Sequence, residues 1–453
     1  MKPSRFQTKS LQAFPQGEAV ARILSAAVES VEPGAAVRRH LKRVGDRLTL
    51  ADQTYDLTSF RRVRVVGAGK AGAPMAAAIE SILADRLEDG LVIVKEGYRE
   101  PGCRKIQLLE AGHPLPDERG VLAARQLNQM LQDSQSDDLV ICLLSGGGSA
   151  LLVSPATGVA LGAVQDLTGA LLRSGANIQE INTLRKHLET LKGGNLARRI
   201  APARLITLVL SDVIGDPLDM IASGPTVPDP TSFQQAWEIL ERFDLIDQAP
   251  QAILTHLQKG LEGQIEETPK SDNLLFERTQ ILVIGSNRLA AQAALEQARL
   301  EGFNTLLLTT SMQGEARQVG RVLASIGREM AESGRPVPRP GCVIAGGETT
   351  VTVTGDGLGG RNQELALGAV ADLAGIQKVM LISLATDGGD GPTDAAGAVV
   401  TGATLERAQA LGLNVAVYLK NNDAYHLFDP LDDLLKPGPT MTNVNDLTFI
   451  FSL

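Results

Sequence analysis

The chain has 453 residues, of which 43% are hydrophobic and 3% aromatic, and it contains 46 glycines. This length exceeds a single ordinary core, so we expect two domains, and the composition favours a glycine-rich α/β enzyme over a β-sandwich or a disordered chain. The formal net charge of −9 argues against a nucleic-acid-binding surface as the main function, although it allows a local basic pocket.

The cysteines and the hydropathy pattern indicate where the protein works. Cys103, Cys142 and Cys342 lie far apart and form no CxxC pair, which is typical of free thiols in a reducing compartment. The first residues contain no apolar signal core, and no apolar stretch approaches the roughly 20 residues of a membrane span. We therefore expect a soluble cytoplasmic protein without a membrane partner.

The first glycine-rich loop, GAGKAG at residues 67–72, follows a predicted strand and precedes a predicted helix. It matches the GxGxxG pattern of dinucleotide-binding folds, and Glu96 lies near the spacing of a ribose-binding acid. Lys70 instead places a cation where it could neutralise a phosphate or a carboxylate. The phosphate-loop pattern GxxxxGK[ST] is absent, because Arg64 stands where a glycine is needed and Ala71 follows the lysine.

A second glycine-rich loop follows the aliphatic residues 139–144, which predict a strand covered on both faces. Ser145 and the three glycines at 146–148 allow close approach to the backbone, and Ser149 is placed to cap the helix that follows. A strand, a bare loop and a helix start aim backbone N–H groups at an anion. A plain turn between strand and helix explains this loop equally well.

One histidine lies between the two loops, in the proline-rich sequence GHPLPD at residues 112–117. His113 is a candidate acid or base. A lone loop histidine before a proline is more often structural, so the catalytic interpretation is the less favoured one.

The middle of the chain supplies further charged candidates. A helix is predicted over residues 178–199, and it places Arg185 and Lys192 about two turns apart on one face, as anion ligands or as an ordinary polar face. Asp212 and Asp216 follow a predicted buried strand, at the strand end where α/β proteins bind ligands. They are candidates for metal or substrate binding, with turn capping as the alternative.

The last third of the chain contains more glycine-rich loops. Residues 260–277 indicate a linker, and residues 351–354 predict a strand after Glu348. Arg361 lies at a glycine-rich helix start, where a guanidinium suits an anion. Asp387 and Asp390 are separated by glycines after a strand, which predicts a magnesium or catalytic-base site.

Ten motifs together resemble the glycerate 2-kinase (MOFRL, class II glycerate kinase) family, and the resemblance covers nearly the whole chain. These motifs are GAGKA at 67–71, LSGGGSALL at 144–152, NTLRKHL at 182–188, KGGNLA at 192–197, SDVIGDP at 211–217, ASGPT at 222–226, GGETTV at 346–351, GGRNQELAL at 359–367, ATDGGDGPTDAAGA at 385–398 and PGPTMTNVND at 437–446.

The resemblance implies an α/β protein of two domains with the active site in the cleft between them. Residues 1–265 would form an N-terminal Rossmann-like α/β/α sandwich, and residues 266–453 a smaller C-terminal MOFRL α/β domain. The implied reaction is the transfer of phosphate from ATP to the C2 hydroxyl of D-glycerate, which gives 2-phosphoglycerate and ADP, with Mg²⁺ as cofactor. D-glycerate and ATP would be the partners, and a homodimer is left open.

The motifs and their chemistry together predict the site. The predicted catalytic residues are Lys70, Arg361 and Asp387, and the predicted metal ligands are Asp387 and Asp390. The residues predicted to bind nucleotide or substrate are Gly67, Gly69, Ser145, Gly146, Gly147, Gly148, Ser149, Arg185, Lys192, Asn195, Asp212, Glu348 and Asn362.

Two other functions compete with this one. An NAD(P)H-dependent hydroxypyruvate reductase is motivated by the GxGxxG loop and Glu96, although no Arg/Glu/His set typical of hydroxyacid dehydrogenases is evident. A small-molecule-binding regulator built on the same cleft would close on its ligand without turnover. The excess of acidic and basic side chains in the glycine-rich loops argues against the regulator.

Overall fold

The computed structural model describes residues 1–99 and 103–453. The chain forms two compact units. The parallel-sheet unit contains Pro33–Ile284, and the mixed-sheet unit contains Met1–Glu32 together with Gly285–Leu453.

These units differ from the expected division at residue 265 in two respects. The first 32 residues join the C-terminal unit, where α2 (Gly17–Ser30) packs on α12 (Asn287–Leu300) and Arg22 forms a bidentate ion pair with Glu301 at 2.7 and 2.8 Å. Residues 260–277, predicted as a linker, pack within the parallel-sheet unit, because Thr268 Oγ1 donates to Asp229 Oδ2 at 2.9 Å.

The parallel-sheet unit is built on six strands in the order β6-β5-β4-β7-β8-β9. The strands are β4 (Arg62–Ala68), β5 (Leu87–Lys95), β6 (Ile106–Ala111), β7 (Asp138–Leu144), β8 (Arg204–Leu210) and β9 (Thr279–Gly285). Every residue of β7 is buried, as predicted for a strand covered on both faces. Strands β5 and β6 lie on one side of β4, and the strands from β7 onward lie on the other, while β4 and β7 run parallel. The order of the strands thus reverses between β4 and β7, and the loops that follow these two strands lie where doubly wound folds bind ligands.

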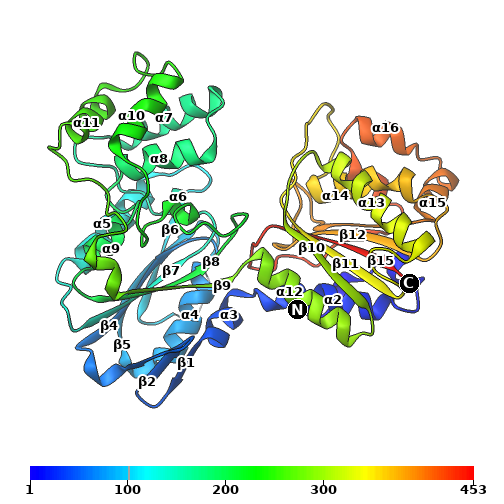
Figure 1. The fold of residues 1–453 in the computed structure, drawn as a ribbon, viewed down its shortest axis with the longest axis horizontal. Helices are drawn as coiled ribbons and strands as arrows, with labels where there is room; N and C mark the ends of the chain where they lie inside the picture. The colour runs from blue at the N-terminus through cyan, green and yellow to red at the C-terminus, as the bar shows by residue number, and fades with distance from the viewer. Residues whose placement is uncertain (100–102) are drawn as a thin grey trace. The chain divides into compact units, whose positions relative to one another are not determined.

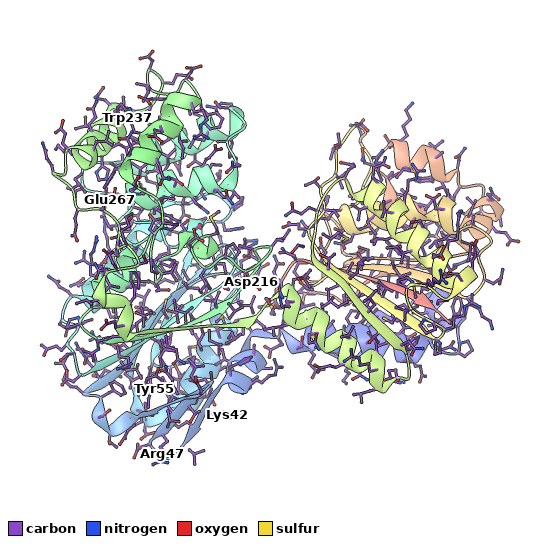
Figure 2. All side chains as sticks on the ribbon, in the orientation of Figure 1. Lys42, Arg47, Tyr55, Asp216, Trp237 and Glu267 are labelled. Carbon is purple, nitrogen blue, oxygen red and sulfur yellow. The ribbon has the colours of Figure 1, made fainter. Side chains whose placement is uncertain are left out.

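Helices cover this sheet and extend beyond it (Figure 1). The helices α4 (Gly72–Leu83), α5 (Glu118–Leu131) and α9 (Asn195–Ile200) pack against the strands. A separate helical layer with its own apolar core consists of α7 (Leu161–Arg173), α8 (Ile178–Leu188), α10 (Phe233–Arg242) and α11 (Gln251–Leu261). A small antiparallel sheet contains β1 (Leu41–Val44), β2 (Arg47–Leu50) and β3 (Gln53–Asp56). Tyr55 of β3 and Trp237 of α10 mark the small sheet and the helical layer in Figure 2.

The helix predicted over residues 178–199 is two helices. The first, α8, ends at Leu188, and the second, α9, begins at Asn195. Gly193 and Gly194 between them have φ values of 56° and 81°, which a continuing right-handed helix does not allow. The prediction that Arg185 and Lys192 share one helix face is therefore wrong.

The mixed-sheet unit has six strands in the order β10-β11-β15-β12-β13-β14. They are β10 (Asn304–Met312), β11 (Gly341–Gly347), β12 (Val379–Ala385), β13 (Gly397–Thr401), β14 (Leu434–Leu435) and β15 (Asp446–Ser452). The helices α13 (Ala316–Ser333) and α14 (Arg361–Leu373) pack together on one face, and α2 and α12 lie on the other (Figure 1). The α/β class is thus confirmed for both units.

The strand predicted over residues 351–354 is wrong, because the structure forms no strand there. Side chains rather than a neighbouring strand satisfy this segment: Thr352 N donates to the Glu315 carboxylate at 3.1 Å, and Thr354 N donates to Asn422 Oδ1 at 2.8 Å. None of the helices within residues 1–99 and 103–453 combines the length and the apolar character needed to cross a membrane.

Candidate functional site

Two glycine-rich loops pack directly on each other at the ends of β4 and β7. We name them the first loop (residues 67–72) and the second loop (residues 145–149). Lys70 N donates to Gly146 O at 2.9 Å, and Ala71 N donates to Ser145 Oγ at 3.1 Å. The first loop also bonds to the neighbouring strand, because Gly69 N donates to Ile93 O at 3.0 Å. Three consecutive N–H groups of the first loop are therefore used inside the protein.

The glycines of the first loop serve this close packing. A Cβ atom built on Gly67 would lie 2.3 Å from Leu143 O, and one built on Gly69 would lie 2.0 Å from Ser145 Oγ. A dinucleotide loop instead turns its N–H groups toward a pyrophosphate. Glu96, the expected ribose ligand, forms an ion pair with Arg119 at 2.8 Å. The geometry of the first loop thus does not support a dinucleotide site.

The second loop leaves three of its five N–H groups open among the described residues. Within residues 1–99 and 103–453, the N–H groups of Gly146, Gly147 and Ser149 have no acceptor. Gly147 has a φ of 83°, the left-handed conformation that turns successive N–H groups to one side. Such a cluster of unpaired N–H groups is an anion-binding concavity.

The Ser149 hydroxyl has a different role from the predicted helix cap. The short helix α6 (Gly148–Leu151) has Gly147 as its N-cap, without a side-chain cap. Ser223 Oγ donates to Asn182 Oδ1 at 3.0 Å, and because one hydroxyl has one proton, Ser149 Oγ must donate to Ser223 Oγ at 2.8 Å. The capping prediction is wrong, and the N–H group of Ser149, not its hydroxyl proton, is left without an acceptor among the described residues.

Two side chains of opposite charge border the second loop. A Cβ atom built on Gly146 would lie 2.1 Å from Asp212 Oδ2, and one built on Gly147 would lie 3.3 Å from Lys70 Cγ. Burial raises the pKa of the Asp212 carboxyl, and the charge of Lys70 opposes this rise. The Lys70 ammonium has no hydrogen-bond or ion-pair partner in the part of the chain that the structure describes. Asp216 lies later in the segment after β8 and is labelled in Figure 2. Its φ is 55°.

Arg185 lies on α8, about one turn beyond Asn182, whose side chain connects through Ser223 to the second loop. Burial lowers the pKa of this partly buried guanidinium, and the charge of Glu189 opposes the shift. Among the described residues the Arg185 side chain has no hydrogen-bond or ion-pair partner. It is therefore available to an anion.

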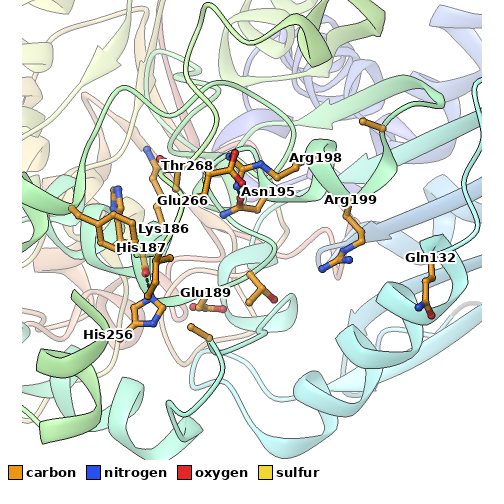
Figure 3. Close-up of a pocket in the computed structure, with 15 residues that line it drawn as sticks. Gln132, Lys186, His187, Glu189, Asn195, Arg198, Arg199, His256, Glu266 and Thr268 are labelled. Atoms are coloured by element: carbon orange, nitrogen blue, oxygen red, sulfur yellow. Dashed lines mark hydrogen bonds and ion pairs between the residues drawn. The ribbon is translucent and has the colours of Figure 1, made fainter. Parts of the chain in front are cut away.

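Lys192 and Asn195 each bond to other residues of the parallel-sheet unit. Lys192 is fully buried and paired with the equally buried Glu189. Asn195 lines a separate pocket of about 490 Å³, drawn in Figure 3, and its Oδ1 accepts a hydrogen bond from Arg198 at 2.8 Å. Lys186 also lines this pocket and is buried, and its ammonium pairs with Asp219 and Asp229, both at 3.2 Å. Both lysines are thus engaged by carboxylates of the protein.

The mixed-sheet unit has a polar pocket of its own, with a volume of about 560 Å³. Glu348, Arg361, Asp387 and Asp390 line it. Arg361 contacts Asp446 at 2.5 and 3.1 Å and Glu348 at 2.7 Å. Burial alone would lower the pKa of Arg361, but the carboxylates of Asp446 and Glu348 raise it above its ordinary value. The guanidinium is thus held in place by two acids, one of them at the pocket wall.

Asp390 and Asn362 are tied into the start of α14. The Asp390 carboxylate accepts from Asn362 N at 3.1 Å and from Gln363 N at 2.9 Å, and Asn362 Oδ1 accepts from Ser383 Oγ at 2.6 Å. Burial raises the pKa of Asp390 to about 6, against the effect of these donors. Asp390 therefore satisfies N–H groups that no residue of α14 can satisfy.

The fit of a magnesium ion differs between the two predicted ligands. Asp387 is exposed at the pocket and accepts from Gly389 N at 3.2 Å, so its carboxylate can reach a bound cation. The carboxylate of Asp390 is already used by the helix, which fits a metal ligand poorly. Among residues 1–99 and 103–453, no group of three or more His, Cys, Asp or Glu side chains is placed to hold a metal ion.

Sequence reasoning missed Asp446 and Ser223 and undervalued His113. Asp446 pairs with Arg361 from the first position of β15, 85 residues later in the chain, so no local pattern joins them. Ser223 contacts the second loop from the end of a short 3₁₀ helix, η4 (Ile221–Ser223). The pair HisPro at 113–114 was visible, but only the fold places His113 beside Gly147.

The strand order, the open second loop, and the lysine and carboxyl beside it define the class: an α/β protein that binds small anionic substrates. Comparisons with known proteins identify the family. The model of a domain of unknown function, DUF4147, matches residues 19–258, and the MOFRL family model matches residues 341–446.

The relatives and solved structures agree with these matches. A protein of Pyrococcus horikoshii named glycerate 2-kinase is 40% identical over 94% of this chain and 95% of its own length. The crystal structure of a glycerate kinase from Thermotoga maritima superposes with a TM-score of 0.87 at 40% identity, over 96% of this chain and 99% of that one. A protein of Agrobacterium vitis named putative hydroxypyruvate reductase is also 40% identical, over 95% of this chain and 93% of its own. The chain belongs to the glycerate 2-kinase family.

Proposed function

We propose that this protein is a glycerate 2-kinase that transfers the γ-phosphoryl group of ATP to the C2 hydroxyl of D-glycerate, giving 2-phosphoglycerate and ADP. The observation that carries this proposal is the second loop, whose open N–H groups lie beside Lys70 and Asp212. Phosphoryl transfer depends mainly on positioning and on neutralising negative charge, and these groups supply both.

The phosphoryl group is the anion that the second loop is best suited to bind. Its three equatorial oxygens carry the charge of the transition state, and the N–H groups of Gly146, Gly147 and Ser149 are donors already fixed in place. Lys70 adds a full positive charge next to them. In this proposal Gly67, Gly69 and Ser145 hold the second loop in position and do not touch the substrate.

Asp212 is the proposed acceptor of the hydroxyl proton. As the C2 oxygen forms its bond to phosphorus, the bond between phosphorus and the β–γ bridging oxygen breaks, ADP leaves, and the hydroxyl proton moves to the carboxylate. A carboxyl whose pKa is raised by burial is a better proton acceptor than an exposed one. Arg185, with no partner among the described residues, would bind the glycerate carboxylate.

The mixed-sheet unit supplies a second cation, Arg361. Its contact with the partly exposed Glu348 is the one that a phosphate oxygen would replace, because Asp446 is buried beneath the guanidinium. Mg²⁺ would neutralise the phosphates of ATP and would be held mostly by them, with Asp387 as the protein ligand. A cytoplasmic location and a homodimer stay predictions.

A hydroxypyruvate reductase is the second candidate, because a close relative carries that name. A test must therefore separate the two reactions. We would incubate the purified chain with D-glycerate, ATP and Mg²⁺, resolve 2- from 3-phosphoglycerate, and follow NADH with hydroxypyruvate in parallel. Magnesium-dependent 2-phosphoglycerate without NADH loss supports the kinase, and NADH loss without phosphoglycerate overturns it.

The same assay tests the two cations. Lys70→Met and Arg361→Gln should each lower kcat by about 10²- to 10³-fold, the usual effect of removing one group that stabilises transition-state charge. Lys259→Met and Arg288→Gln are matched controls, because both side chains are exposed and lie outside the two sites. If Lys70→Met turned over as fast as the wild type, the proposal that the second loop and Lys70 bind the phosphoryl group would be wrong.

A further inference from the structure

His113 is held rigidly between β6 and α5. Asp117 caps α5 by accepting from Gly120 N at 3.1 Å, and it also binds Arg119 at 2.7 Å. A Cβ atom built on Gly112 would lie 2.8 Å from Asp117 Oδ2, so the backbone next to His113 packs tightly on this capping carboxylate. The imidazole therefore has a fixed support.

The edge of the His113 ring packs against Gly147 of the second loop. A Cβ atom built on Gly147 would lie 2.9 Å from His113 Cδ2 and 3.1 Å from His113 Nε2, on the side where it would also meet the Lys70 chain. Glycine at position 147 lets both side chains approach. The Nε2 end of the imidazole is thus the end nearest to the loop whose N–H groups are open.

The chemical state of the ring follows from its surroundings. Burial, together with the charges of Lys70 and Lys95, lowers the pKa of His113 to about 4, so the ring is neutral at physiological pH. The imidazole has no hydrogen-bond or ion-pair partner in residues 1–99 and 103–453. A neutral ring has one donor and one acceptor nitrogen, and here both are without protein partners.

We propose that His113 is a direct substrate ligand, which donates a hydrogen bond from Nε2 to the substrate oxygen bound at the second loop. This inference rests on the proposed function, because the oxygen belongs to the phosphoryl group or to D-glycerate. A base of such low basicity gains little by taking the hydroxyl proton, so the role that fits His113 is hydrogen bonding and not proton transfer. Among the residues that the structure describes, no carboxylate orients the ring as in a His–Asp pair, so the fixed loop must do so.

Three variants of His113 test this role through kcat/KM for D-glycerate and for ATP. His113→Phe keeps a flat ring and removes both nitrogens, and we expect it to lose about ten- to a hundredfold in kcat/KM for at least one substrate. His113→Gln places an amide near the position of Nε2 and should recover activity to within about fivefold of wild type. His113→Asn places its amide near Nδ1 and should resemble His113→Phe. His426→Phe, which replaces an exposed histidine of the mixed-sheet unit, should have no effect.

Further readouts separate binding from structure. The unfolding temperatures of the variants should match the wild type, and their kcat/KM profiles between pH 6 and 9 should run parallel to it. Equal loss in all three variants, without rescue by glutamine, would show that the ring only packs and would overturn the proposal. Unchanged activity in His113→Phe would also overturn the proposal. So would a kcat/KM profile of a variant that loses a titrating limb between pH 6 and 9.

The failure of the proposed function would be visible separately. If the wild type forms no phosphoglycerate, calorimetric titration of wild type and His113→Phe with inorganic phosphate still measures the anion site. Weaker phosphate binding in the variant supports His113 as a ligand of that site. Equal binding overturns the inference about His113, whatever the reaction.

Discussion

The two glycine-rich loops of the parallel sheet have similar sequences and opposite roles. The N–H groups of the first loop donate to Ile93, Gly146 and Ser145, whereas those of Gly146, Gly147 and Ser149 in the second loop have no acceptor among the described residues. The first loop uses its N–H groups to hold neighbouring segments of the protein together, and the second loop has N–H groups that an anion can reach. A run of glycines therefore predicts a backbone without side chains. Whether that backbone can bind a ligand depends on whether its N–H groups already have acceptors within the protein.

The largest effect is expected from a methyl group in the first loop. In Gly67→Ala the added Cβ would lie 2.3 Å from Leu143 O, a backbone atom of the neighbouring strand that cannot move aside. We expect the free energy of unfolding to fall by about 1–3 kcal/mol or more, as in other overpacked cores. Urea denaturation would measure it. Gly162→Ala is the matched control, because nothing lies within 4 Å of its added Cβ. A Gly67→Ala variant as stable as the wild type would contradict the close packing of the first loop on β7.

In the second loop the same change should lower activity beyond the effect of backbone strain alone. Gly147→Ala would press on His113 and Lys70 and strain a backbone at φ 83°. A small displacement of these groups is expected to lower kcat/KM about a hundredfold. Gly158→Ala has a similar φ of 86° with open space around its Cβ, so it carries the same backbone strain without the contact. Equal activity of the two variants would contradict our account of the loop.

The pH dependence of kcat/KM tests the pair of Lys70 and Asp212. Burial raises the pKa of Asp212 and Lys70 lowers it, so kcat/KM should fall as the pH falls through the pKa of Asp212. Lys70→Met removes the opposing charge, which raises this pKa further and moves the acid limb to higher pH. Profiles of kcat/KM between pH 4.5 and 8 for both proteins would show the shift. A limb that stays in place, or moves to lower pH, would rule out this coupling.

The smallest effect concerns the Ser149 hydroxyl. Because it donates to Ser223, its removal in Ser149→Ala should change kcat/KM by less than about fivefold and cost about 1 kcal/mol of stability. Ser154→Ala removes a similar buried hydroxyl pair, with Thr190, and serves as the stability control. A loss of about tenfold or more in activity would mean that the hydroxyl itself binds substrate.

Much of the fold could be predicted from local sequence. The aliphatic run before the second loop predicts β7, whose residues are all buried. The helix predicted over residues 178–199 and the strand predicted over residues 351–354 failed because glycines at positive φ and side-chain acceptors override local periodicity.

The sequence by itself determined the α/β class, the family, the two glycine-rich loops with Lys70 in the first, and an acid, Asp212, directly after a buried strand. Local pattern suffices for these, because strand burial, glycine spacing and motif order are properties of short stretches. Only the tertiary structure decided which loop has open N–H groups, that residues 1–32 join the C-terminal unit, and that His113 lies on Gly147. Each of these depends on contacts between distant segments, because a hydrogen-bond partner or a packing neighbour is supplied by the fold and not by the adjacent residues.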